Sequence, residues 1–128
     1  MVAVDTNVII RFLTRDHPSE AARATELFGS EQIWISKTVL LESAWVLGSL
    51  YGFEDAQVEN ALRALAGLPN TQVEDVIAVA QAFDLHAQGL EFADALHLAS
   101  MGAAKTFATF DAKFSKRAQR AAMPVRSL

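Results

Sequence analysis

Four acidic residues of this sequence occupy positions at which a carboxylate could do chemistry: Asp5, Glu42, Asp94 and Asp111. Two of them follow β-type runs, residues 2–4 and 106–109, and open α/β sheets bind ligands at the carboxyl ends of such strands. Glu42 lies on a predicted helix face that is otherwise largely apolar, where a carboxylate is costly unless a cation or a hydrogen-bond donor meets it. Asp94 lies on another predicted helix, three residues before His97.

Each of these acids also has an ordinary structural interpretation. Asp5 could cap the following helix, and Glu42 could reach water from the rim of the core. Asp94 could be a first-turn acid that suits the helix dipole, and Asp111 could form an Asx turn. The remaining acids are expected in helix first turns or on solvated faces, among them Glu20, Glu26, Glu54, Asp55, Glu59, Glu74 and Asp75.

The four acids mean more together, because two strand ends and two helices can converge at one edge of a parallel sheet. Two carboxylates ~4 Å apart repel by about 4 kcal/mol at an effective dielectric constant near 20, so such a cluster needs protons or cations. The chain has no cysteine, which excludes zinc–thiolate and iron–sulfur sites, disulfides and a cysteine nucleophile. Oxygen ligands without a Cys or a paired His select hard ions, so the sequence predicts Mg²⁺ or Mn²⁺ in this pocket.

Short β-type runs alternate with longer helical ones, which predicts an α/β fold with a mostly parallel sheet in a single domain spanning 1–128. The expected strands are residues 2–4, 33–35, 71–73 and 106–109, with an edge strand at 124–126. The expected helices are residues 8–13, 19–28, 38–51, 55–66, 74–87, 92–103 and 115–122.

Composition limits the partners that this fold could bind. The formal net charge of -4 excludes a generally basic surface, so contact with RNA or DNA needs local basic residues or metal ions. The candidates lie close in sequence to the acids: Arg11, Arg15, Lys37 and Lys113. The basic stretch 113–120 is equally well explained as an ordinary solvated helix face. Asp5 interrupts the apolar start too early for a signal peptide or membrane span, so a cytoplasmic protein without membrane contact is expected.

The acids and their neighbours resemble the motifs of the PIN-domain nucleases, most closely the VapC-type toxins of bacterial toxin–antitoxin pairs. The resemblance rests on residues 4–8 around Asp5, on Thr38 with Glu42, on residues 92–96 around Asp94, and on residues 109–111. It spans residues 2 to about 114. It implies a PIN-like three-layer α/β/α fold, with a central, mostly parallel sheet flanked by helices.

The resemblance also implies a mechanism. Asp5 and Asp94 look like the principal Mg²⁺ or Mn²⁺ ligands, completed by Glu42 and Asp111. Small polar side chains would orient these carboxylates: Thr6, Asn7 and Thr109. The implied activity is that of an endoribonuclease toxin, which hydrolyses RNA phosphodiesters with a metal-activated water.

Expected partners and alternative functions follow from the same resemblance. The partners are the RNA substrate, a cognate antitoxin that places an arginine in the acidic pocket, and a second copy in a homodimer through the apolar helices. A catalytically idle PIN-like module that binds RNA or protein is the alternative. A metal-dependent phosphatase or a phosphoacceptor receiver fits less well, because a phosphatase needs a second aspartate where Asn7 stands.

Overall fold

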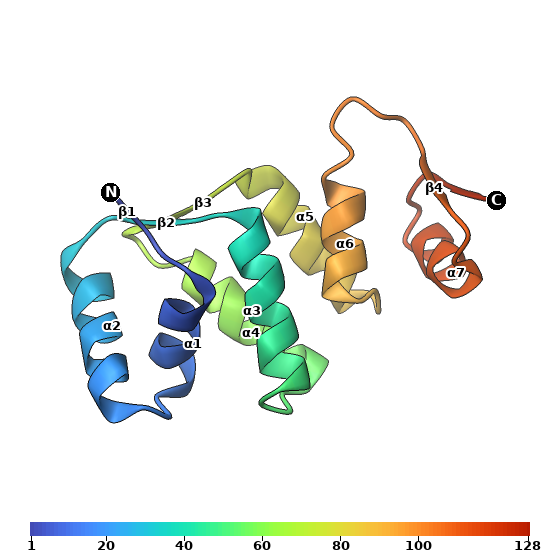
Figure 1. Ribbon diagram of the computed structural model, residues 1–128. Coiled ribbons are helices and arrows are strands. Elements are labelled where there is room, and N and C mark those ends of the chain that lie inside the picture. The colour runs from blue at the N-terminus through green and yellow to red at the C-terminus, as the bar shows by residue number, and fades with distance from the viewer. The chain divides into compact units, whose positions relative to one another are not determined.

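Three short parallel strands organise the first part of the chain: β1 (Val2–Ala3), β2 (Ile33–Ile35) and β3 (Thr71–Val73). The computed structural model describes all residues 1–128, and the chain divides into two units, Met1–Val76 and Ile77–Leu128. The strand order in the first unit is β1-β2-β3, with Val2 opposite Ile33 and Ile33 opposite Thr71 (Figure 1). The backbone N–H of Val4 donates to the carbonyl of Trp34 at 3.2 Å, so the chain remains in register with β2 up to Asp5.

Four helices accompany this sheet: α1 (Thr6–Thr14), α2 (Pro18–Ser30), α3 (Lys37–Ser49) and α4 (Asp55–Ala66). Helix α1 packs against α2 and α3, α3 packs against α4, and α4 contacts β3. Local capping explains where the helices begin. Ser36 accepts from the backbone N–H of Val39 at the start of α3. Glu54 and Gln57 form a reciprocal capping box at the start of α4.

The core of the first unit forms where the apolar faces of these helices meet the strands. The fully buried side chains come from α1, β2, α3 and α4: Ile9, Ile10, Ile33, Ile35, Leu40, Leu47, Leu62 and Leu65. Full burial of one such side chain contributes roughly 1.5–3 kcal/mol. Phe12 and Phe28 stack with ring centroids 4.2 Å apart and join α1 to α2. The packing of α1 therefore fixes the position of the turn that carries Asp5.

The second unit contains α5, α6, β4, α7 and β5. Their bounds are Val76–Ala87, Phe92–Ala99, Phe107–Thr109, Ala112–Arg120 and Val125–Ser127, so α5 begins at the last residue of the first unit. Strands β4 and β5 pair in parallel, with Phe107 opposite Val125, and α7 packs against β5. The apolar faces of α5, α6 and α7 bury Val79, Phe83, Ala95, Leu98 and Ala118. No helix of the chain is both long and apolar enough to cross a membrane.

The structure confirms the predicted α/β class with a parallel sheet flanked by helices, and every strand pair is parallel. Three helix boundaries differ from the prediction. Helix α5 begins at 76 rather than 74, because the Glu74 N–H donates to the Ile35 carbonyl and Asp75 has φ 54. Helix α6 ends at 99 rather than 103, ahead of Gly102 with φ 61. Helix α7 begins at 112 rather than 115, because Asp111 caps it.

Candidate active site

Asp5 lies between β1 and α1 and caps the helix. One of its carboxylate oxygens, Oδ1, accepts from the backbone N–H of Val8 at 3.1 Å. The other oxygen, Oδ2, has no hydrogen-bond partner, and the side chain is exposed. The helix-cap interpretation of Asp5 is therefore correct, and it leaves one oxygen in place for a ligand.

Thr6 connects this strand end to Glu42 on α3. Thr6 is only 7% exposed, and its hydroxyl donates to Oε1 of Glu42. Ser36 and the apolar packing of α3 fix the helix that carries Glu42. The hydrogen-bond donor expected for a carboxylate on this face is thus supplied by the residue next to Asp5.

Asp111 repeats the arrangement of Asp5 in the second unit. It follows β4, and its Oδ1 accepts from the backbone N–H of Phe114 at 2.9 Å, so that Oδ2 has no partner. The hydroxyl of Thr109 accepts from the backbone N–H of Asp111 at 2.9 Å. Thr109 therefore holds the main chain of Asp111, not its carboxylate.

Asp94 lies in the first turn of α6 and is partly buried. Burial raises its pKa above the usual range, and the negative charges of Glu91 and Asp111 add to the increase, while His97 and Arg117 oppose it. The effect of Asp111 on this pKa shows that the two carboxylates lie within electrostatic reach of each other. Asp94 and Asp111 form the acidic pair of the second unit.

Each unit thus contains two of the four predicted acids, Asp5 with Glu42 and Asp94 with Asp111. No group of three or more His, Asp or Glu side chains in the structure is arranged to hold a metal ion. A site built from one unit alone would offer two carboxylates, fewer than Mg²⁺ or Mn²⁺ takes from most protein sites that fix it without a substrate.

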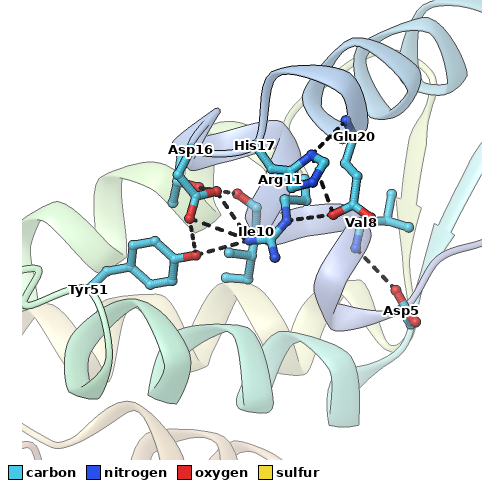
Figure 2. A network of polar contacts seen from close by, with 9 residues as sticks. Asp5, Val8, Ile10, Arg11, Asp16, His17, Glu20 and Tyr51 are labelled. Atoms are coloured by element: carbon cyan, nitrogen blue, oxygen red, sulfur yellow. Dashed lines mark hydrogen bonds and ion pairs between the residues drawn. The ribbon is translucent and has the colours of Figure 1, made fainter.

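Arg11, predicted to contact RNA, is held by protein groups on one side of α1 (Figure 2). Its guanidinium donates to Glu20 at 2.8 Å, to Asp16 at 3.1 Å and to the Tyr51 hydroxyl at 3.1 Å. The Tyr51 hydroxyl in turn donates to Asp16 at 2.6 Å. Hydrogen bonds from Tyr51 and Thr14 lower the pKa of Asp16, and the one from Arg11 lowers the pKa of Glu20. The guanidinium is therefore engaged in joining α1, α2 and the end of α3.

The other predicted RNA contacts and Asn7 differ in their surroundings. Lys37 pairs with Asp75, Nζ to Oδ2 at 3.2 Å, and its backbone N–H donates to Glu74 at 2.9 Å. The expectation that these two acids only lie in a first turn or on a solvated face was wrong. Arg15 ends α1 with φ 56 and is exposed, as is Lys113 on α7. Asn7 makes no hydrogen bond and lines a cavity of ≈ 310 Å³ between α1 and α2.

Comparison with known families assigns the fold. The family model of the PIN domain matches residues 2–119, from the start of β1 to within α7. The chain belongs to the PIN-domain family. No match to an individual curated protein was found. PIN domains are generally nucleases that use divalent metals, so the family indicates a nuclease-type hydrolase.

The donor set of this PIN domain fits such a metal. All four predicted ligands are carboxylates, and neither Cys nor a His pair accompanies them. Hard cations such as Mg²⁺ and Mn²⁺ prefer oxygen ligands of this kind. The Oδ2 atoms of Asp5 and Asp111 are not used by the helix caps, so a cation could bind there without uncapping α1 or α7.

Several residues around the acids were missed in the sequence. Tyr51 completes the Arg11 network, and Arg117 acts on Asp94 from three turns of chain further on. Trp45, for which a core role was expected, is 60% exposed on α3. Phe110 is 84% exposed directly before Asp111. A bulky apolar residue between a strand end and a capping acid was the available signal for Phe110.

Proposed function

We propose that this PIN-domain protein is a Mg²⁺- or Mn²⁺-dependent endoribonuclease in which Asp5, Glu42, Asp94 and Asp111 together hold the ion. The observation that carries the proposal is the pair of strand-end acids, which each cap a helix with one oxygen and keep the other free. Membership of a family of metal-using nucleases supports it, as does the all-carboxylate donor set.

The chain's own residues have separate tasks in this proposal. Asp5 and Asp111 present oxygens whose direction the helix caps fix. Thr6 holds the Glu42 carboxylate by its hydrogen bond and so limits the positions that Glu42 can adopt. A hard dication bound by these acids supplies an activated water and neutralises charge on the phosphodiester. Its positive charge also allows an acidic pocket to accept a polyanion.

Cleavage of labelled RNA by the purified chain tests the activity. Cleavage of single-stranded or structured RNA should need Mg²⁺ or Mn²⁺, stop with a chelator, and fall at least about 100-fold in Asp5→Asn and Asp94→Asn. Asn is as good a helix cap as Asp, so Asp5→Asn should fold normally. Glu26→Gln, an exposed change on α2, is the matched control and should cleave like the wild type.

Metal binding gives a readout that does not depend on activity. A ligand that binds only the folded state stabilises it, so Mn²⁺ should raise the unfolding midpoint of the wild type and of Glu26→Gln. The increase should shrink in Asp5→Asn and in Asp94→Asn. RNA that is cut equally well with chelator, or equal Mn²⁺ stabilisation in all four chains, would contradict the proposal. RNA binding without any cleavage would instead favour the idle binding module.

We further propose that the protein acts in the cytoplasm as the toxin of a toxin–antitoxin pair and forms a homodimer. The exposed Trp45 and Leu50 on α3 support an apolar partner face. The antitoxin would act by placing an arginine among the acids, where charge-assisted hydrogen bonds are strong. Induced expression should arrest bacterial growth, and co-expression of a small protein encoded beside the gene should restore it. Growth that is unaffected by the wild type would remove the toxin role.

A further inference from the structure

Charge is strongly segregated along this chain. Residues 100–128 contain six Lys or Arg and one acid, Asp111, although the whole chain carries 15 Asp or Glu and a net charge of -4. The positive charge is therefore concentrated in the segment that also supplies one of the proposed metal ligands. Such a local patch is what a chain of this overall charge would need to bind a polyanion.

Helix α7 arranges four of these basic residues in one stripe. They stand at positions i, i+3, i+4 and i+7, which share one face of a helix: Lys113, Lys116, Arg117 and Arg120. The opposite face buries Phe114, Ser115 and Ala118, and this anchors the stripe outward. None of the four forms a hydrogen bond or an ion pair.

Helix stability does not explain this stripe. Like charges three or four residues apart repel each other on a helix. The helix dipole favours Arg117 and Arg120 near the C-terminus but disfavours Lys113 in the first turn. A solvated face of ordinary composition would include acids to relieve this repulsion, and residues 112–120 contain none.

An exposed aromatic ring lies at the start of the stripe. Phe110 is 84% exposed, the largest exposure among the large hydrophobic side chains, and immediately precedes the capping residue Asp111. Single-stranded nucleic acids are bound by this combination, in which basic groups follow the backbone and bases stack on aromatic rings. An acidic peptide would use the basic groups and has no need of the ring.

We propose that Phe110 and the α7 stripe bind single-stranded RNA beside Asp111, with a base stacked on Phe110 and backbone phosphates on the four basic side chains. The stripe spans about 10 Å at ~1.5 Å per residue. A stacked strand rises ~3.4 Å per nucleotide, so about three phosphates fit along it. The proposal rests on the proposed RNA substrate and identifies where that strand is held.

Binding of a fluorescent 12-nucleotide RNA to the full chain, measured by anisotropy in chelator, tests the stripe without cleavage. Each lost contact with a single strand reduces the slope of log K against log[salt] by ~0.7, or about fivefold in affinity at ~0.1 M salt. Lys116→Gln/Arg120→Gln should therefore bind about 25-fold more weakly, with a slope shallower by ~1.4. The control Arg23→Gln/Arg63→Gln removes equal charge from α2 and α4 and should bind like the wild type.

The aromatic ring is tested in the same assay. Phe110→Leu keeps an apolar side chain but loses the stacking surface, and should bind about five- to 150-fold more weakly. Phe110→Trp should retain affinity, and its fluorescence should be quenched when RNA binds. Unfolding midpoints of these exposed variants should match the wild type.

The outcomes separate this inference from the proposed nuclease activity. Metal-dependent cleavage with unchanged binding in the α7 variants, or no binding by the wild type at low salt, overturns the RNA face alone. Stripe-dependent binding without cleavage supports the face and removes the nuclease. Poly-glutamate that binds as tightly as RNA, with the same loss in the Lys116→Gln/Arg120→Gln variant and none in Phe110→Leu, would assign the face to an acidic protein segment.

Discussion

The hydrogen bond between Thr6 and Glu42 can be tested by Thr6→Val, which removes the hydroxyl and retains a β-branched side chain. Hydrogen bonds to charged groups contribute roughly 1.5–3 kcal/mol. Glu42 is exposed, so water replaces the lost donor and reduces this value. Valine also leaves no unpaired group at a position that is 7% exposed. The expected coupling between the two side chains is therefore about 1 kcal/mol.

A double-mutant cycle measures this coupling directly. The free energy of unfolding is determined by urea titration for the wild type, Thr6→Val, Glu42→Ala and the double variant. For a chain of this length, about 1 kcal/mol corresponds to ~4 °C in Tm. Thr6→Ser keeps the hydroxyl and should retain Mn²⁺ affinity, whereas Thr6→Val should lose about 10- to 100-fold.

Two results would refute this reasoning. A coupling energy below about 0.3 kcal/mol is within the range seen for independent sites, and would mean that Thr6 does not hold Glu42. Equal Mn²⁺ affinity in Thr6→Val and Thr6→Ser would mean that the hydroxyl does not prepare Glu42 for a cation.

Three further predictions concern stability. Ser43 is 0% exposed and its hydroxyl has no partner, so Ser43→Ala should stabilise the chain by about 1 kcal/mol in urea unfolding; a lower midpoint would show that the hydroxyl is bonded. Tyr51→Phe removes the hydroxyl that bridges Arg11 and Asp16, so the Tm should fall by a few degrees, and an unchanged Tm would mean that the network adds nothing. The lowered pKa values of Asp16 and Glu20 stabilise the fold above the unfolded-state pKa values and are lost as the pH falls through the folded ones. The Tm should therefore drop below about pH 4, and less so in Asp16→Asn.

The sequence predicted best those features that depend on neighbours along the chain. Ser36, followed by an apolar helix, identified the start of α3, and 55–66 matched α4 in both bounds. The Asp5 interpretation as a cap or a site residue could not be decided locally, and the structure shows that the cap uses only one oxygen. The assignment of the four acids to one metal site stays a prediction, as does the single domain.

Contacts between distant segments could not be predicted in the same way. Arg11 looked like a free cation near the acids, but Tyr51 reaches it only because α1 packs against α3. The same holds for Lys37, whose partner Asp75 becomes available through the pairing of β2 with β3. Each of these contacts depends on tertiary packing, which the composition of either segment does not encode.

The division of labour within the Asp5 and Asp111 carboxylates has a consequence for inheritance. An aspartate codon becomes an asparagine codon by a single base change, and the amide would still cap α1 or α7. A gene altered in this way would produce a well-folded polypeptide that occupies the same strand of RNA without cutting it. Beside an intact copy in the same cell, such a variant would act as a competitor, with effects distinct from those of a deletion.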